Sequence, residues 1–193
     1  LYATGRKANT ANIGLEHTDI ATNERGAIVV NDTCESSVPG VYAVGDVNGG
    51  PQFTYISLDD FRIVFGALTG NSQYTLKDRK NIPYTTFLTP PLSRVGLTEE
   101  DAINQGYTVK TKEMLVATMP RAHVNDYLKG AFKIVVDADN DLILGATLYS
   151  QGAEELINLI KMAMDNNIPY TYFKNQIFTH PTMAENLNDL CNF

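Results

Sequence analysis

The stretch AFKIVVDADNDLILGATLY, residues 131–149, decides the fold of the second half of this chain. Two apolar runs within it, residues 131–136 and 142–149, have the length and composition of β-strands. The five residues between them, DADND at 137–141, are polar and typical of a tight connection. The stretch therefore predicts two antiparallel strands joined as a hairpin.

Downstream of the hairpin, residues 153–165 predict the strongest helix of the chain. One face of it carries the apolar side chains of Ala153, Leu156, Ile157, Ile160, Ala163 and Met164. Leu159 and Met162 add apolar surface outside that stripe. A helix that is apolar over more than one face is usually buried on two sides, so we expect this one to lie in a core or against a partner subunit.

Upstream of the hairpin, residues 84–88 and 107–116 are further strand candidates. A short helix is expected between them, with Thr98 as its cap and Asp101 completing an approximate capping box. The polar stretch 77–81 precedes all these elements, and we place a domain boundary there. Beyond that boundary the sequence predicts strands mixed with helices.

The first third of the chain predicts a piece of sheet followed by a helix. Residues 26–30 form a short strand candidate. The apolar run 41–44 predicts a fully buried parallel strand that delivers Asp46 to its carboxyl end. Residues 54–69 predict a helix that ends at Gly70.

The Gly45-Asp46 pair indicates a ligand site, because ligands of open α/β sheets bind at the carboxyl ends of strands. An acid there can accept hydrogen bonds from sugar or ribityl hydroxyls, and Gly45 lets the backbone approach a flat or phosphorylated ligand. The N-terminus of the next helix, near residues 54–58, favours a partial negative charge on a bound group. A Gly-Asp pair taken alone also fits a simple turn, so both interpretations stay open.

Near the end of the chain, the block THPTMAE at residues 179–185 indicates proton transfer. Pro181 suits the first position of a helix, since it lacks an N–H and its φ is preset. This placement leaves His180 just outside the helix, with Glu185 slightly more than one turn along. A carboxylate at that reach can bond one imidazole nitrogen, fix the tautomer and raise the basicity of the other nitrogen. The alternative is a helix start that carries a chance histidine.

Composition excludes several classes of protein. The chain has 193 residues, 44% hydrophobic and 19% charged, an ordinary globular composition. A formal net charge of −7 argues against a surface that follows nucleic-acid phosphates. No apolar run approaches the ~20 residues needed to cross a bilayer. Only two cysteines are present, which argues against a disulfide scaffold and fits a reducing cytosol.

The remaining histidines and cysteines predict little chemistry. Their spacing does not fit a structural zinc site, and no metal site is expected. We expect His17 to be solvated and His123 to lie in a loop. We expect Cys34 to act as an inert small hydrophobe and Cys191 to lie in a frayed terminus. The chain begins with Leu1 rather than Met, and we expect it to be cut from a longer protein.

Four motifs, taken in order, resemble one family. They are ATGR at 3–6 with NT at 9–10 and IGLE at 13–16, VPGVYAVGD at 38–46, VGLTE at 95–99, and HPT at 180–182 with Glu185. Together they resemble the C-terminal part of the class I pyridine nucleotide-disulfide oxidoreductases. That family includes glutathione reductase, dihydrolipoamide dehydrogenase and mercuric reductase, and the resemblance covers essentially the whole chain.

More narrowly, the chain is similar to the branch linked to reactive-chlorine resistance, whose members are described as copper(II) reductases. The segments that carry this similarity are QFTYISLDDFR at 52–62, TPPLSR at 89–94 and NLNDL at 186–190. Mercuric reductases carry a vicinal cysteine pair at the C-terminus, where this chain has Cys191 alone. That difference puts their mercury-delivery route in doubt here.

The resemblance implies an α+β fold. Residues 78–193 would form a dimerisation domain with an antiparallel sheet flanked by helices, and residues 1–77 would be the remnant of an FAD-binding α/β domain. FAD and NAD(P)H would be cofactors of the longer parent, and this chain would hold an incomplete FAD site. The residues implied for that site are Gly45, Asp46, Gln52, Phe53, Thr54 and Tyr55.

The resemblance also implies a catalytic role for His180 and Glu185. His180, oriented by Glu185, would reach into the partner's active site in a homodimer and serve as acid/base for a redox dithiol there. The acceptor would be a small-molecule disulfide or a metal ion, in the cytoplasm, with no nucleic-acid or membrane partner. The redox cysteines and the NAD(P)H domain are absent from this chain, so we expect the isolated chain to be inactive.

Two alternatives remain. One is a flavin NAD(P)H oxidase or coenzyme A disulfide reductase with a single redox cysteine, a class that generally lacks the His-Pro-Thr-x-x-Glu block. The other is a non-catalytic dimerisation module in which His180 is only a satisfied helix-end residue.

Overall fold

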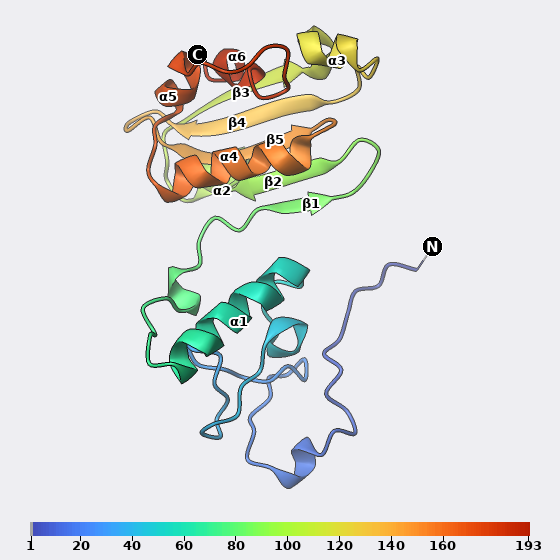
Figure 1. Ribbon diagram of the computed structural model, residues 1–193, viewed down its shortest axis with the longest axis vertical. Coiled ribbons are helices and arrows are strands. Elements are labelled where there is room, and N and C mark those ends of the chain that lie inside the picture. Colours follow the sequence, from blue (N-terminus) through green and yellow to red (C-terminus); the bar gives the residue numbers. More distant parts are fainter. Residues whose placement is uncertain (1) are drawn as a thin grey trace. The chain divides into compact units, whose positions relative to one another are not determined.

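The computed structural model describes residues 2–193, and Leu1 lies outside the described residues. The chain divides into two compact units, residues 1–79 and residues 80–193. The division falls inside the polar stretch 77–81. Figure 1 shows the helices and strands of each unit.

The second unit is built on a five-stranded sheet in the order β1-β2-β5-β4-β3, with every neighbouring pair antiparallel. The strands are β1 (Tyr84–Thr86), β2 (Leu92–Gly96), β3 (Val109–Leu115), β4 (Ala131–Asp137) and β5 (Ile143–Tyr149). The predicted hairpin is confirmed, since Ala131 in β4 lies opposite Tyr149 in β5 and the pairing runs back to the turn. Strands β1 and β3 form the two edges of the sheet.

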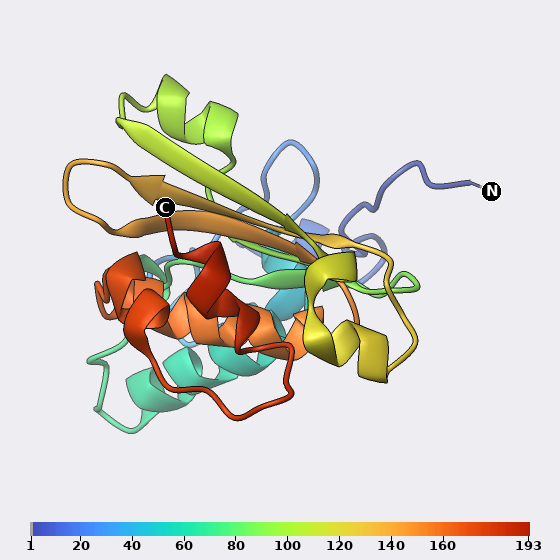
Figure 2. The same ribbon diagram turned by 90° about the horizontal axis from the view of Figure 1, so that it is seen from above.

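Five helices accompany this sheet. They are α2 (Glu99–Asn104), α3 (Pro120–Val124), α4 (Ala153–Asp165), α5 (Tyr170–Asn175) and α6 (Asn186–Leu190). Figure 2 shows α4, α5 and α6 on one face of the sheet and α2 on the other. This arrangement confirms the predicted α+β fold of an antiparallel sheet flanked by helices.

The core of the second unit lies between the sheet and α4. Its fully buried side chains include Phe132, Ile134 and Leu148 from the strands and Ile157 and Ile160 from α4. The helix predicted over residues 153–165 is confirmed with those bounds, and its predicted face is the buried one. Leu159 and Met162 are exposed, so within this unit α4 is buried on one face only.

The short helix α2 follows its predicted start signal. The Thr98 hydroxyl accepts the Asp101 N–H, and the Asp101 side chain accepts the Thr98 N–H, so the capping box is complete. Gly106 has a φ of +88°, a conformation that suits glycine just beyond a helix end. Here the local sequence alone is enough to fix the element.

Strand β2 was not predicted, because it buries a polar residue. Ser93 lies on the buried face with no exposed surface, where the pattern should show an apolar residue. Its hydroxyl pairs with the Thr85 hydroxyl of β1 at 2.8 Å, which satisfies it without water. Because this buried residue is a serine, the sequence of β2 lacks the alternation of apolar and polar residues that indicates a strand.

Helix α5 begins at Tyr170, and Tyr170 and Phe173 both pack into the core. Two predictions in this unit were wrong in detail. His123 lies in helix α3, which begins at Pro120, rather than in a loop. Cys191 is fully buried rather than frayed, since the end of α6 inserts into the core. Burial raises the pKa of the Cys191 thiol to about 12.

The first unit has one long helix, α1 (Thr54–Leu68), which confirms the helix predicted there. Gly70 follows its end with a φ of +74°, as the stop signal predicts. The other elements are single turns of 3₁₀ helix at Leu15–His17, Gly45–Asn48 and Leu76–Asp78.

The two strands predicted in the first unit are absent from its described residues. Ile28 makes only an isolated bridge to Thr22, and Tyr42 only an isolated bridge to Glu35. The run 41–44 folds back on residues 34–36, with Val41 and Val44 both about two-fifths exposed. A buried parallel strand needs neighbours on both sides, and the described residues of this unit supply none.

Among residues 2–193, no helix is long and apolar enough to span a membrane. Nor do three His, Cys, Asp or Glu side chains of these residues come together as a possible metal site.

Candidate functional site

His180 and Glu185 make the contact that the sequence predicts, on a different backbone. The His180 Nδ1 atom lies 2.7 Å from Glu185 Oε2. The His180 side chain is 67% exposed and that of Glu185 is 18% exposed, so the imidazole faces outward from a largely buried carboxylate. No hydrogen bond joins Nε2 of His180 to another described residue, which leaves that nitrogen available to a reacting group.

The predicted helix start at Pro181 was wrong. The His180–Pro181 peptide is cis, and helix α6 begins only at Asn186. Thr182, rather than Pro181, organises this turn. Its N–H donates to Glu185 Oε1 at 3.1 Å, and its hydroxyl accepts the Glu185 N–H at 3.2 Å. The T-x-x-E spacing at 182–185 is the signal that sequence reasoning missed.

This turn is anchored at its far end. The buried Asn186 side chain donates to the carbonyls of Thr182 and Met183. Asn188 Nδ2 donates to the Phe173 carbonyl at 2.7 Å and to that of Gln176 at 2.9 Å. These bonds join the turn that carries His180 to α5 and to α6, whose leucines are buried. The backbone position of His180 is therefore well fixed.

The Gly45-Asp46 pair forms a turn of 3₁₀ helix at Gly45–Asn48 rather than a strand end. The Asp46 side chain is 52% exposed, and its nearest basic group is Arg6 Nη1 at 3.8 Å. Gly45 is buried with a φ of +71°, and a Cβ atom added there would lie 2.6 Å from the Ser57 hydroxyl of α1. The turn therefore lies flush against α1 and presents Asp46 outward.

The N-terminus of α1 is the second part of the predicted ligand site. Phe53 precedes it in an extended conformation, no side chain caps the first turn, and no acid lies in that turn. The rings of Phe53 and Tyr55 stack with centroids 5.0 Å apart, while Gln52 and Thr54 are exposed. This end of the helix suits a group with partial negative charge.

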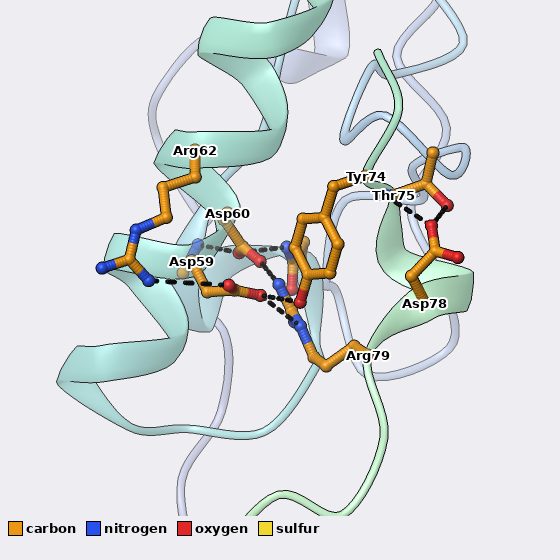
Figure 3. Close-up of polar contacts among 9 residues, drawn as sticks. Asp59, Asp60, Arg62, Tyr74, Thr75, Asp78 and Arg79 are labelled. Atoms are coloured by element: carbon orange, nitrogen blue, oxygen red, sulfur yellow. Dashed lines mark hydrogen bonds and ion pairs between the residues drawn. The ribbon is translucent and has the colours of Figure 1, made fainter. Parts of the chain in front are cut away.

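A group of charged residues beside this turn was not predicted (Figure 3). Asp60 of α1 is fully buried. Arg79, the last residue of the unit, places its Nη2 atom 2.5 Å from Asp60 Oδ1. Arg79 Nε also bonds Asp59 Oδ2 at 2.8 Å, and the Tyr74 hydroxyl donates to the same oxygen at 3.2 Å. Nineteen or twenty residues separate Arg79 from these carboxylates, so no local pattern in the sequence indicates the contact.

The pKa values of Arg79 and of the nearby Cys34 are both raised. Burial alone would lower the pKa of Arg79, but its bonds to Asp60 and Asp59 outweigh it and raise that pKa. Cys34, which is fully buried, has a pKa raised to about 11 by burial and, next, by the negative charge of Asp60. The prediction that Cys34 is an inert thiol fits this environment.

The family can be decided at this point. Residues 82–191 match the family described as pyridine nucleotide-disulphide oxidoreductase, dimerisation domain, and residues 1–60 match the pyridine nucleotide-disulphide oxidoreductase family. This chain belongs to the pyridine nucleotide-disulphide oxidoreductases.

Named relatives agree with this assignment to the oxidoreductases. The chain is 48% identical over 190 residues to the probable pyridine nucleotide-disulfide oxidoreductase RclA of Escherichia coli K12. It is 34% identical over 187 residues to a mercuric reductase of Staphylococcus aureus. These alignments cover 98% and 97% of this chain but only 43% and 34% of the relatives, so the chain spans less than half their length.

Solved structures of the family give the same picture. The HOCl-induced flavoprotein disulfide reductase RclA from Escherichia coli superposes with a TM-score of 0.95, covering 98% of this chain and 43% of that one. A Cu(II) complex of the same protein also matches with a TM-score of 0.95 and the same coverage. The predicted membership in this family of oxidoreductases is therefore confirmed, whereas the roles of individual site residues stay predictions.

Proposed function

We propose that this chain supplies the acid/base histidine and the dimer-forming domain of an FAD-dependent oxidoreductase that uses NAD(P)H to reduce a disulfide or a metal ion. One observation carries the proposal. An exposed imidazole, His180, is held at Nδ1 by the largely buried carboxylate of Glu185 at 2.7 Å. A histidine with only a structural role in the turn would need neither the outward placement nor the fixed partner.

The geometry defines what His180 can do. With Glu185 ionised, the neutral imidazole donates its Nδ1–H to Oε2, and Nε2 keeps the lone pair. That lone pair can take the proton of a thiol within hydrogen-bond reach, which gives a thiolate and an imidazolium. Glu185 balances the new positive charge, and the same Nε2–H later returns the proton.

The thiol in this proposal comes from a second copy of the protein. The described residues contain two cysteines, Cys34 and Cys191, and both are fully buried. The match of residues 82–191 to a dimerisation domain supports a homodimer in which His180 serves the dithiol of the other subunit. The exposed apolar residues Leu159, Met162 and Ile177 of this unit are available for such an interface.

The residues proposed for FAD fit its chemistry. The exposed Asp46 carboxylate is an acceptor for ribityl hydroxyls, and the uncapped, acid-free first turn of α1 suits a carbonyl oxygen with partial negative charge. We assign Gly45, Asp46, Gln52, Phe53, Thr54 and Tyr55 to this site. When bound, FAD supplies the transfer of two electrons from a nicotinamide to a disulfide.

The names of the relatives support a class of acceptor. RclA is named as a flavoprotein disulfide reductase with a Cu(II) complex, and other relatives are named mercuric reductases. We therefore propose a small disulfide or a metal ion as acceptor for the whole protein. Free cysteines and a net charge of −7 support a cytoplasmic enzyme with no nucleic-acid partner.

The test is an anaerobic titration of the full-length flavoprotein with NAD(P)H, followed by visible absorbance. We expect a long-wavelength band after two electrons, the signature of a thiolate beside the flavin, and we expect His180→Ala to weaken that band at neutral pH. Direct bleaching of the flavin without the band would contradict the dithiol mechanism and favour a flavin oxidase. An unchanged band in His180→Ala would leave His180 with only a structural role in a dimerisation module.

A further inference from the structure

Asp60 is the most deeply buried charge beside the proposed FAD site, yet it is not among the residues assigned to bind the cofactor. Its side chain has no exposed surface. A carboxylate in such a place needs both a counter-charge and hydrogen bonds, because burial of an unpaired charge is very unfavourable. All of its partners lie within the first unit.

One oxygen of Asp60 holds the turn that carries Asp46. Oδ2 accepts the Gly45 N–H at 2.7 Å and the Asn48 side-chain amide at 2.9 Å. These two donors flank Asp46 on either side in the sequence. Asn48 also donates to the Ala43 carbonyl, so the same link holds the chain that enters the turn.

The approach of this turn to α1 is close enough to be specific. A Cβ atom at Gly45 would lie 2.6 Å from the Ser57 hydroxyl, one helical turn before Asp60. The backbone of Gly45 is therefore set by two contacts with the same helix, one steric and one electrostatic. Asp46, the next residue, inherits its position from them.

The other oxygen of Asp60 is occupied by Arg79. Nη2 of Arg79 bonds Oδ1 at 2.5 Å, and only a tenth of the Arg79 side chain is exposed. Figure 3 shows Arg79 reaching both Asp59 and Asp60 across adjacent positions of α1. Arg79 thus provides the positive counter-charge for the buried Asp60 carboxylate next to the Gly45 N–H.

We infer that Asp60 and Arg79 are positioning residues of the FAD site, acting through the Gly45 N–H to fix the Asp46 carboxylate. This inference rests on the proposed function, because it assumes that Asp46 binds the ribityl chain. Neither Asp60 nor Arg79 needs to touch the cofactor. Their effect on FAD binding is transmitted through one turn, by the Gly45 N–H and the Asn48 side chain.

The substitution Asp60→Asn gives a sharp test. A carboxamide offers one acceptor and one donor group, whereas Asp60 accepts bonds from three donors. Whichever way the amide is turned, an N–H group faces either Arg79 or the pair Gly45 and Asn48. Asp59→Asn is the matched control, because Asp59 also bonds Arg79 but makes no bond to the turn.

The experiment measures the FAD dissociation constant of the full-length apoprotein by flavin fluorescence, with thermal unfolding of each apoprotein alongside. We expect Asp60→Asn to weaken FAD binding roughly ten- to a hundredfold, the effect of losing a hydrogen bond to a charged group. Asp59→Asn should weaken it by less than about threefold. In the variant Asp46→Ala, adding Asp60→Asn should produce no further weakening, because the residue that Asp60 positions is gone.

The outcomes separate the two proposals. If Asp46→Ala alone leaves FAD affinity unchanged, the proposed FAD site is wrong and this inference falls with it. If Asp46→Ala weakens binding and Asp60→Asn weakens it by the same factor in both backgrounds, the FAD site stands and the positioning role is wrong. An equal loss in Asp59→Asn and Asp60→Asn would also overturn the inference, because it would show a general effect of charge on α1.

A second variant guards against simple misfolding. Asp60→Asn combined with Arg79→Met removes the guanidinium that would face the new amide N–H, while an amide oxygen remains to accept the Gly45 N–H. We expect this double variant to recover part of the FAD affinity lost in Asp60→Asn. A double variant that binds FAD no better than the single one would count against the charge-balanced link.

Discussion

The two units of this chain differ in how much apolar surface they bury. The second unit closes its own sheet and buries a continuous core that includes Phe132, Leu148 and Ile160. In the first unit, only Ala27, Cys34, Ala43, Ile56 and Ile63 are buried hydrophobic residues among those described. Its helix α1 leaves Leu58, Phe61, Phe65 and Leu68 exposed.

This difference shows where each proposed site obtains its rigidity. His180 stands on a turn tied by side-chain hydrogen bonds to helices that pack on a core. Asp46 stands on a turn held by hydrogen bonds to the buried Asp60 carboxylate, which Arg79 neutralises, and by a glycine contact. Packing fixes the first site, and electrostatics fixes the second.

The largest expected effect concerns the packed unit. In the full-length protein, His180→Ala should lower acceptor reduction by roughly 10²- to 10⁴-fold, the usual contribution of a positioned acid/base. FAD content and dimerisation should be unchanged, since His180 is exposed and carries no core contact. Steady-state kinetics, flavin absorbance and light scattering measure the three quantities.

His123→Ala is the matched control for that experiment. His123 is also an exposed histidine of the second unit, and its Nε2 contacts only the Ala117 carbonyl. It should leave acceptor reduction unchanged. Activity that survives His180→Ala, or that falls equally in His123→Ala, contradicts the catalytic role.

A pair of phenylalanines tests the contrast in packing. Phe132→Ala in β4 should destabilise the second unit by about 3–5 kcal/mol, because it empties a fully buried site. Phe61→Ala on the exposed side of α1 should cost less than about 1 kcal/mol in the isolated chain. Urea denaturation followed by circular dichroism measures both values.

The two losses of unfolding free energy test whether the units differ in packing. A loss above 2 kcal/mol at Phe61 would show that this side chain is buried in solution. Equal losses at both positions would remove the distinction between the two units.

The two buried thiols allow the pH dependence of stability to be compared between the units. The pKa of Cys191 is raised from 9.0 to about 12, so the stability that this buried thiol contributes is present below about pH 9 and is lost as the pH rises toward 12. Relative to Cys191→Ala, the native protein should lose on the order of 1 kcal/mol per pH unit between pH 9 and pH 11.

Cys34 in the first unit has a pKa of about 11, so the same comparison with Cys34→Ala should give a smaller change over a narrower range. Unfolding free energies measured at pH 8, about pH 10 and about pH 11.5 give both changes, because the two curves separate only above the pKa of Cys34. Identical pH dependence in native protein and Cys191→Ala would show that this thiol titrates normally.

The smallest expected effect lies at a helix cap. Thr98→Ala removes the hydroxyl that completes the capping box of α2 and should cost about 1 kcal/mol. Thr98→Ser keeps a hydroxyl at the same place and should cost only a fraction of that. Thermal unfolding of residues 80–193 distinguishes the two, and equal shifts would mean that the cap contributes nothing.

Sequence patterns predicted the packed unit well because its elements are local. The hairpin over residues 131–149 and the helix over 153–165 depend on short-range periodicity, and both are present. Strand β2 was missed because Ser93 interrupts the apolar alternation, while its hydroxyl is hydrogen-bonded to that of Thr85 on the neighbouring strand. The His180–Glu185 contact was predicted, although the turn that produces it was attributed to the wrong residue.

The first unit was harder to predict because its structure depends on distant partners. The run 41–44 has the composition of a buried strand, but composition cannot supply the neighbouring strands that such an element needs. The bonds from Arg79 to Asp59 and Asp60 join residues that no local period connects. Long-range electrostatic contacts of this kind become visible only in three dimensions.

The edges of the antiparallel sheet have a consequence for how the protein behaves at high concentration. Strand β1 is only three residues long, and β3 carries Lys110, Lys112 and Glu113 along its length. Lys112 also donates to the Asn192 carbonyl at 2.5 Å, which ties the C-terminal residues to this edge. Short and charged edges discourage the uncontrolled pairing of strands between molecules, so this sheet is protected against growth into aggregates.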